Sequence, residues 1–301
     1  MTNLSFLDSA KITVEEIHTR SSKGATGIIH VQEEDIVTVT IGSMTSYASI
    51  GSNTSAPAPL PAPAAGKEAP DGAWALWDTF TRTPHASVLG NPANFYSRPA
   101  ESNWLSFTTT LHDPSFFERL EKWSGNTPGT GALVTFKDSN WLMSIVVPKQ
   151  PHFINQPSNV QVFWGYALHP EKTGDYVKKP MAECTGAEIL SELLGHLNFP
   201  EHPTLESSTT IPCMMPFITS QFLTREYTDR PKVIPEGSTN LALLGQFVEI
   251  DSDTVFTVEY SVRGAQMAVF ELMGVDKKPH AMYRGDHSLV VMAEALKMML
   301  T

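Results

Sequence analysis

Hydrophobic and polar residues alternate along the first part of the chain, as in β strands that bury one face. KITVEEIHTR alternates, SSKGATG is typical of a turn, and IIHVQEEDIVTVTIGSM is rich in β-branched residues. These segments predict a hairpin followed by a strand that ends at Gly42 and Ser43. Small residues at a strand end allow a ligand to approach the backbone closely.

A proline- and alanine-rich segment, residues 53–72, follows. Proline disfavours both helix and sheet, so NTSAPAPLPAPAAGKEAPDG predicts an extended linker and a domain boundary. Residues 73–205 combine the short aromatic helix AWALWDTF with several strands, which favours a β-rich unit. TGAEILSELLGHL predicts a helix with Thr185 as its N-cap and an apolar face formed by Ile189, Leu190, Leu193, Leu194 and Leu197.

The last third returns to a strand and two helices. NLALLGQFVE predicts a buried strand, and HSLVVMAEALKMML predicts an amphipathic helix at the end. Between them, Ser252 and Asp253 are candidate caps of a helix whose apolar face comprises Val258, Val262, Ala265, Val269 and Leu272. Together these patterns predict a mixed fold of the α/β (α+β) type.

Charge and cysteine content narrow the class of protein. The net charge of −11 argues against nucleic-acid binding and against simple electrostatic adhesion to anionic lipid. Cys184 and Cys213 form no CxxC or metal-ligand spacing, which predicts two buried thiols in a reducing compartment. The start of the chain does not have the pattern of a signal peptide, and the apolar runs are too short to span a bilayer.

The chain lacks the common cofactor and hydrolase motifs. GTGALV, residues 129–134, lacks the third glycine of a dinucleotide motif and precedes a strand, so it predicts a turn. Two segments fit a flavin site better: IVTVTIGSMT, and the helix that begins near Thr257, whose N-terminus presents free N–H groups. Ordinary strand ends look much the same, so the residues alone leave both readings open.

Several blocks in order resemble the oleate hydratase family, the fatty acid hydratases also called myosin-cross-reactive antigens. These blocks include KDSNWLMS, YVKKPMAECTGAEI, TIPCMMPFITSQF, DRPKVIPEGSTNLALLGQFVE and DTVFTVEYSVRGAQMAV, and the resemblance covers nearly the whole chain. It implies a FAD/NAD(P)-binding flavoprotein fold of the amine-oxidase-like type, with a discontinuous FAD domain, an inserted β-rich substrate domain and C-terminal helices.

On this resemblance, the expected domains are returning strands of the FAD-type domain at 1–52, the linker at 53–72 and the substrate-side domain at 73–205. The C-terminal half of the FAD-type domain is expected at 206–275, with a C-terminal helix at 276–301. The cofactor implied is FAD. The residues expected near the isoalloxazine are Gly42, Ser43, Met44, Gly245, Gln246, Phe247, Phe256, Thr257, Glu259 and Ser261.

The chain departs from the family pattern in one large respect. Family members begin with a GxGxxG segment and carry an acidic and a tyrosine catalytic residue upstream of the part that matches here, so no catalytic residue is assigned. The resemblance therefore implies the C-terminal part of a hydratase, which is a truncated gene model, a fragment or a degenerate homologue. This part is expected to be inactive alone and not to hold FAD tightly.

Substrate-side residues are better represented. VVPKQPHF places His152 where the family has a histidine that helps to hold the fatty acid carboxylate, although Val146 and Pro148 stand where some members have polar partners. A purely structural histidine is the alternative. Met214, Met215 and Phe217 are candidate walls of an apolar substrate site, with plain core packing as their alternative.

The function implied is that of a hydro-lyase. It would be an FAD-dependent hydratase that adds water across the cis double bond of oleate-type unsaturated fatty acids to give hydroxy fatty acids. The alternative is a non-catalytic remnant that binds fatty acid or flavin or serves in interactions. Expected partners are an unsaturated fatty acid and no nucleic acid. A homodimer and a peripheral membrane contact stay open. The expected location is the cytoplasm, with membrane association as the alternative.

Overall fold

A computed structural model describes residues 3–6, 11–60, 70, 72–130 and 133–300. The chain forms two compact units. The first comprises Met1–Gly42, Thr79–Gly90 and Arg230–Thr301, and the second comprises Ser43–Asp78 and Asn91–Asp229. Each unit is therefore built from segments that are distant in sequence.

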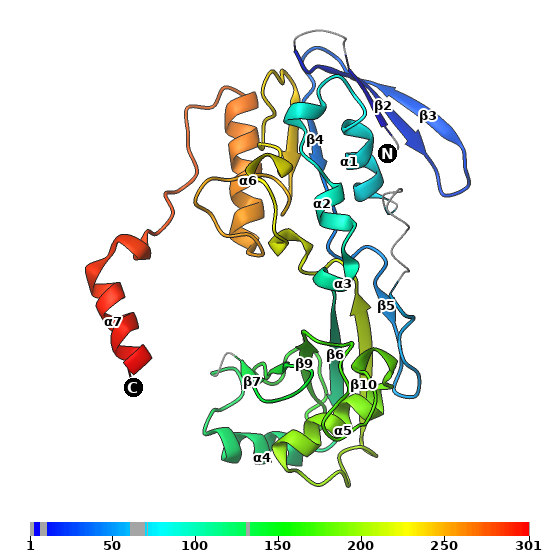
Figure 1. The fold of residues 1–301 in the computed structure, drawn as a ribbon, viewed down its shortest axis with the longest axis vertical. Coiled ribbons are helices and arrows are strands. Elements are labelled where there is room, and N and C mark those ends of the chain that lie inside the picture. Colours follow the sequence, from blue (N-terminus) through cyan, green and yellow to red (C-terminus); the bar gives the residue numbers. More distant parts are fainter. Residues whose placement is uncertain (1–2, 7–10, 61–69, 71, 131–132, 301) are drawn as a thin grey trace. The chain divides into compact units, whose positions relative to one another are not determined.

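The first unit contains two small sheets and the late helices (Figure 1). An antiparallel sheet has the order β1-β2-β3, which confirms the predicted hairpin, and β11 pairs with β4 in parallel. The elements of this unit are β1 (Asn3–Phe6), β2 (Val14–Arg20), β3 (Thr26–His30), β4 (Val37–Thr40), η1 (Ala86–Val88), β11 (Leu241–Leu244), α6 (Val258–Leu272), η5 (Gly285–His287) and α7 (Leu289–Leu300).

Helix α6 differs from its predicted form in two ways. Its N-cap is Thr257, whose hydroxyl accepts a hydrogen bond from the Tyr260 N–H, and not Ser252 or Asp253. Its buried residues are Tyr260, Gly264 and Ala268, so the apolar face predicted from Val258 onward is the less buried one. Two small residues on the buried face allow the helix to pack closely on the chain that follows β11, since a Cβ built on Gly264 would lie 3.6 Å from Cδ1 of Ile250.

The second unit is built on a six-stranded sheet of order β5-β10-β6-β9-β8-β7, in which every pair is antiparallel. The helix α1 (Ala73–Phe80), predicted from AWALWDTF, begins in this unit. The remaining elements are β5 (Ser49–Ile50), α2 (Ala93–Tyr96), α3 (Pro99–Ser102), β6 (Trp104–Leu111), α4 (Ser115–Ser124), β7 (Val134–Phe136), β8 (Met143–Val146), β9 (Gln161–Ala167), η2 (Met181–Glu183), α5 (Gly186–Leu197), β10 (Ser208–Met215), η3 (Ser220–Phe222) and η4 (Tyr227–Asp229).

Residues 206–229 lie in this second unit, although the sequence grouped them with the late segment. The cause is strand β10, which pairs with β6 along all eight of its residues, from Ser208 opposite Leu111 to Met215 opposite Trp104. Residues 43–50 follow because β5 pairs with the end of β10. Long-range strand pairing decided these boundaries, and assigning either unit to FAD or to substrate remains a prediction.

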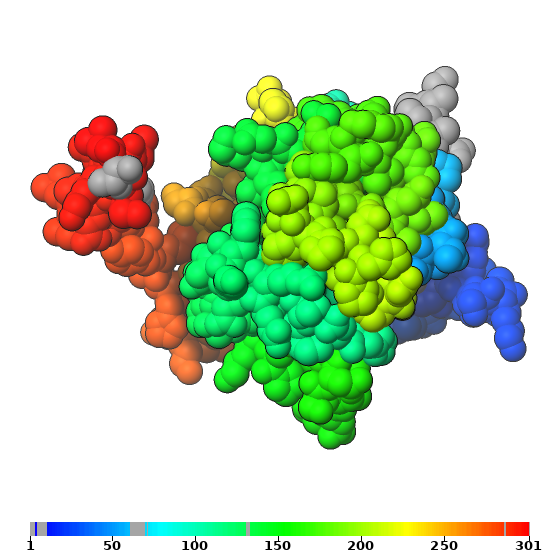
Figure 2. Space-filling view, turned by 90° about the horizontal axis from the view of Figure 1, so that it is seen from below, coloured from blue at the N-terminus to red at the C-terminus, as the bar shows by residue number. Residues whose placement is uncertain are grey.

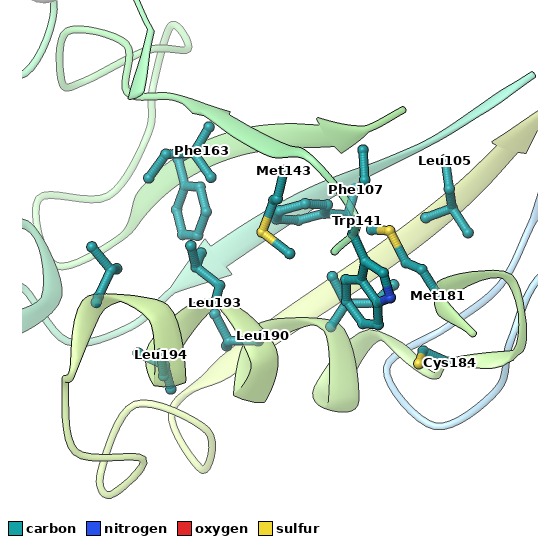
Figure 3. Packing of buried hydrophobic residues seen from close by; sticks show 14 of the residues in the cluster. Leu105, Phe107, Trp141, Met143, Phe163, Met181, Cys184, Leu190, Leu193 and Leu194 are labelled. Carbon is teal, nitrogen blue, oxygen red and sulfur yellow. The ribbon is translucent and has the colours of Figure 1, made fainter. Parts of the chain in front are cut away.

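Helices α4 and α5 both contribute buried residues to the main hydrophobic core on one face of the six-stranded sheet. Leu190 and Leu193 of α5 lie on the side of the helix toward Phe107, Met143 and Phe163 of the strands (Figure 3). The predicted N-cap Thr185 is confirmed, because its hydroxyl and Glu188 form a reciprocal capping box. In the space-filling view, segments near residue 110, coloured green, and near residue 200, coloured yellow-green, form one continuous surface (Figure 2).

Smaller expectations are resolved in part. Most of the predicted linker, 61–69 and 71, lies outside the described residues, and so do 131–132 of GTGALV. Residues 128–130 form a turn with Gly129 at φ +87°, as expected.

Cys184 is buried, which raises the pKa of its thiol to about 12, whereas Cys213 is only partly buried. No helix in the described part of the chain combines the length and apolarity needed to cross a membrane.

Candidate functional site

The first candidate site lies where the parallel strands β4 and β11 end. Leu244 is paired with Thr40, so Gly245, which follows Leu244, and Gly42, two residues after Thr40, leave the same edge of the strand pair. Both glycines have positive φ, +66° at Gly42 and +102° at Gly245. In open sheets with parallel strands, ligands bind outside this carboxyl edge.

Gly42 is required by close packing as well as by its backbone angle. A Cβ built on Gly42 would lie 2.4 Å from Cδ2 of Phe247, whose ring is almost fully buried. The structure thus brings two predicted flavin-side residues into contact. Ser43 and Met44 follow in the chain but belong to the second unit, where the Ser43 carbonyl accepts a hydrogen bond from the Trp74 indole at 2.8 Å.

Gln246 joins the end of β11 to the start of α6. Its side-chain amide donates to the Thr257 carbonyl at 3.0 Å and to the Ser261 hydroxyl at 2.8 Å. Its side-chain oxygen accepts from the Phe256 N–H. Four of the predicted cofactor-side residues, Gln246, Phe256, Thr257 and Ser261, therefore form one network. Because both amide protons of Gln246 are used inside it, this side chain positions the loop.

The start of α6 combines a helix N-terminus with a strained aromatic residue. Phe256 has φ +77°, a conformation that bulky residues rarely adopt, and its side chain is exposed. Glu259, in the first turn, is exposed too. The helix N-terminus carries partial positive charge and free N–H groups, which favour a negatively charged or carbonyl-bearing ligand edge.

Tyr260, which the sequence analysis did not single out, holds the start of α6 against the chain that follows β11. Its hydroxyl donates to the Val248 carbonyl at 2.6 Å and accepts from the Ile250 N–H at 3.1 Å. The ring is fully buried, and burial raises the pKa of its hydroxyl. Tyr260 thus ties α6 to the chain that follows β11.

His152 lies in the loop between β8 and β9. Its side chain is exposed and its ring stands edge-on to the Phe153 ring, with centroids 4.7 Å apart. Gln156 shapes the loop by accepting the His152 N–H at 2.9 Å and by donating to the Gln150 side-chain oxygen at 2.9 Å. The His152 side chain is therefore accessible to an anion in solution.

The three candidate wall residues lie in different surroundings. Met214 is buried in the hydrophobic core, and Phe217 is buried against Trp74 with ring centroids 5.8 Å apart. Met215 is half-buried on the other face of the sheet. Since neighbouring strand residues point to opposite faces, only Met215 shares a face with the open side of the sheet.

That open side, opposite α4 and α5, carries aromatic residues that the sequence analysis missed. Tyr166 stacks on Trp104 with centroids 4.5 Å apart and lies 5.9 Å from the Trp164 ring. Ile211 lies on the same face, beside Thr108, and both Trp164 and Ile211 are exposed. We call this surface the open face. Alternation in WLSFTTTL, QVFWGYA and STTIPCMM was the signal that could have revealed it.

A third cluster comprises Asp175, Glu192 and His196. The His196 Nε2 atom lies 3.3 Å from a Glu192 oxygen and 3.5 Å from an Asp175 oxygen, close enough for a shared metal ion. However, the fully buried Glu192 carboxylate accepts three backbone N–H groups, from Asp175, Tyr176 and Val177. These hydrogen bonds explain the buried carboxylate without a metal ion, since it anchors the loop of residues 175–177.

Comparison with known proteins places these features in a family. A model of the MCRA family matches residues 1–270. An oleate hydratase from Streptococcus pyogenes serotype M49 (strain NZ131) is 37% identical over 281 residues, covering 89% of this chain and 46% of that protein. A linoleate hydratase from Lactiplantibacillus plantarum is 33% identical over 287 residues, covering 88% and 48%. The chain thus spans about half the length of the curated relatives it matches, and it belongs to the MCRA family.

Proposed function

We propose that this chain is a portion of an FAD-dependent fatty acid hydratase, a hydro-lyase that adds water across the cis double bond of oleate-type fatty acids. The observation that carries the proposal is its identity of 37% and 33% to proteins named oleate hydratase and linoleate hydratase. The portion is expected to be inactive alone, since no catalytic acid is matched in it.

The residues at the end of β4 and β11 fit the ring-side part of a flavin. Two glycines at positive φ leave the same strand edge, and Gln246, which follows Gly245, is hydrogen-bonded to Thr257 at the N-terminus of α6. Gln246 and Tyr260 hold this loop without presenting their own polar atoms to a ligand. When bound, FAD would contribute charge and shape near the double bond, with no net redox change.

The open face suits the acyl side of the reaction. Its strands, β6, β9 and β10, contain no charged residue, and their outward aromatic rings offer an apolar wall. Hydration of an isolated double bond passes through a carbocation-like transition state, so the surroundings must be apolar and hold only a positioned water and a proton donor. This chain supplies the wall, and we assign it no proton donor.

Replacing His152 by alanine in a complete hydratase that carries this segment is expected to raise KM for free fatty acid about fivefold, with kcat little changed. The reason is that an exposed histidine holding a carboxylate contributes uniform binding. Steady-state kinetics with free acid and with methyl ester test this, and Asn159→Ala on the same loop is the control. If His152→Ala leaves the kinetics with both substrates unchanged, the histidine is structural.

The proposed function is tested by mixing the purified chain with FAD and oleate, with and without the part of the Streptococcus pyogenes relative that lies outside the match. We expect bound flavin absorbance and 10-hydroxystearate only in the mixture. Flavin bound in equal amount to the chain, with turnover by the chain alone, would show that the cofactor site and the catalytic acid are misplaced. If a folded mixture gives no bound flavin and no product, the result favours the alternative, a non-catalytic remnant.

A further inference from the structure

Helix α6 presents an apolar stripe that the described residues of the first unit leave largely exposed. The stripe comprises Val258, Val262, Ala265, Val269 and Leu272, which recur at intervals of four and three residues. Val258 is 76% exposed, Val262 49% and Val269 45%, although valine is usually found inside proteins. Spacing of this kind is the signature of a helix that packs along another helix.

Helix α7 carries a matching seam. Leu289, Met292, Leu296 and Met299 recur at intervals of three, four and three residues, and α7 buries none of its residues. Its two charged residues, Glu294 and Lys297, fall on the opposite side of the helix, since a residue advances by about 100° per position. Apart from these two residues the helix is apolar all round, with Val290, Val291 and Met298 exposed as well, so the seam is the side that carries no charge.

The segment between the helices is short enough to let α7 reach the stripe. Arg263 on α6 donates a hydrogen bond from Nη1 to the His280 carbonyl, so the chain after α6 turns back along the helix. Val258, Val262, Gln266 and His280 line a shallow groove of about 300 Å³ at this point. Only residues 281–288 separate this anchor from Leu289, which corresponds to an extended span of at most about 30 Å.

We infer that α7 packs along the valine stripe of α6 within the same chain, forming a two-helix hairpin. The short tether favours the chain's own helix over a second copy, because it gives α7 a local concentration on the order of millimolar. Anionic lipid is a poor competitor, since the net charge is −11. The family match ends at residue 270, and the inference does not depend on the proposed function.

The test uses paired cysteines in the full chain carrying Cys213→Ala, because Cys213 is the native thiol that is only partly buried. Val262→Cys is combined with Leu296→Cys, which reports antiparallel helices, or with Met292→Cys, which reports parallel ones. The matched control combines Val262→Cys with Glu294→Cys, on the far side of α7. All four positions are exposed, so the core is not disturbed, and far-UV circular dichroism checks that each variant folds.

Under mild oxidation, one of the two seam pairs is expected to form an intramolecular disulfide at least about tenfold faster than the control pair, as judged by non-reducing electrophoresis and peptide mapping. Whichever pair reacts gives the direction of α7. Equal rates for the seam and control pairs would show that α7 has no fixed partner and would overturn the inference. A disulfide formed only between two chains would overturn it as well, in favour of a second copy on the stripe.

Discussion

Replacing Gly42 by alanine is expected to destabilise the first unit by about 2–4 kcal/mol. Two effects combine. Alanine at φ +66° is strained, and its Cβ would lie 2.4 Å from the buried Phe247 ring, which would have to move. The free energy of unfolding measured in urea tests this expectation.

Gly24→Ala is the matched control for this prediction. Gly24 lies in the same unit at φ +83°, but a Cβ there would have no atom within 4 Å. It should cost only the backbone strain, about 1–2 kcal/mol. If the two variants lose equal free energy of unfolding, the Phe247 ring moves aside without destabilising the unit. In the double variant Gly42→Ala with Phe247→Leu, part of the loss should be recovered if the ring clash is real.

Replacing Glu192 by glutamine is expected to destabilise the second unit by about 2–4 kcal/mol. The fully buried carboxylate accepts backbone N–H groups from Asp175, Tyr176 and Val177 at 2.6–2.9 Å. Glutamine removes the charge from these bonds and turns an NH2 group toward one of the donors. Urea denaturation measures the loss. Glu118→Gln on the exposed side of α4 should change stability by less than about 0.5 kcal/mol.

The stability of the wild-type chain and that of Glu192→Gln should depend differently on pH. Burial by itself raises the pKa of Glu192, but the His196 ring 3.3 Å away and hydrogen bonds from the backbone of residues 175–177 outweigh it, and the pKa lies below its ordinary value of 4.5. The unfolded state therefore binds the proton first. The stabilisation is full above pH 4.5 and is lost as pH falls through the folded pKa, so the two unfolding free energies should converge in acid. A gap that persists undiminished at pH 3 would show that the charge of Glu192 is not what stabilises the loop.

Local patterns predicted several elements well. The N-cap Thr185 and the leucine face of α5 could be predicted because both depend on residues within a few positions of one another. The helix start at Thr257, which carries the candidate cofactor edge, was visible for the same reason. The strand predicted from NLALLGQFVE shortens to Leu241–Leu244, because Gly245 turns away at positive φ.

The candidate sites depended more on distant contacts. Gln246 was expected to lie near a flavin, but its role as the link between β11 and α6 appears only when Phe256, Thr257 and Ser261 are near it in space. Met214 and Met215 are adjacent in sequence, yet one lies in the core and the other on the open face. A pattern of period two marks opposite faces but does not say which face a helix will cover.

The sequence by itself determined the family, through blocks of residues that matched in order, and the helices and hairpins that arise from nearby residues. Only the tertiary structure decided that β10 pairs with β6, that Phe247 fills the space beside Gly42, and that Glu192 anchors a loop. The physical reason is range. Capping and periodicity are encoded within a few residues, whereas sheet pairing and buried hydrogen bonds join groups whose separation along the chain places no mark on the local pattern.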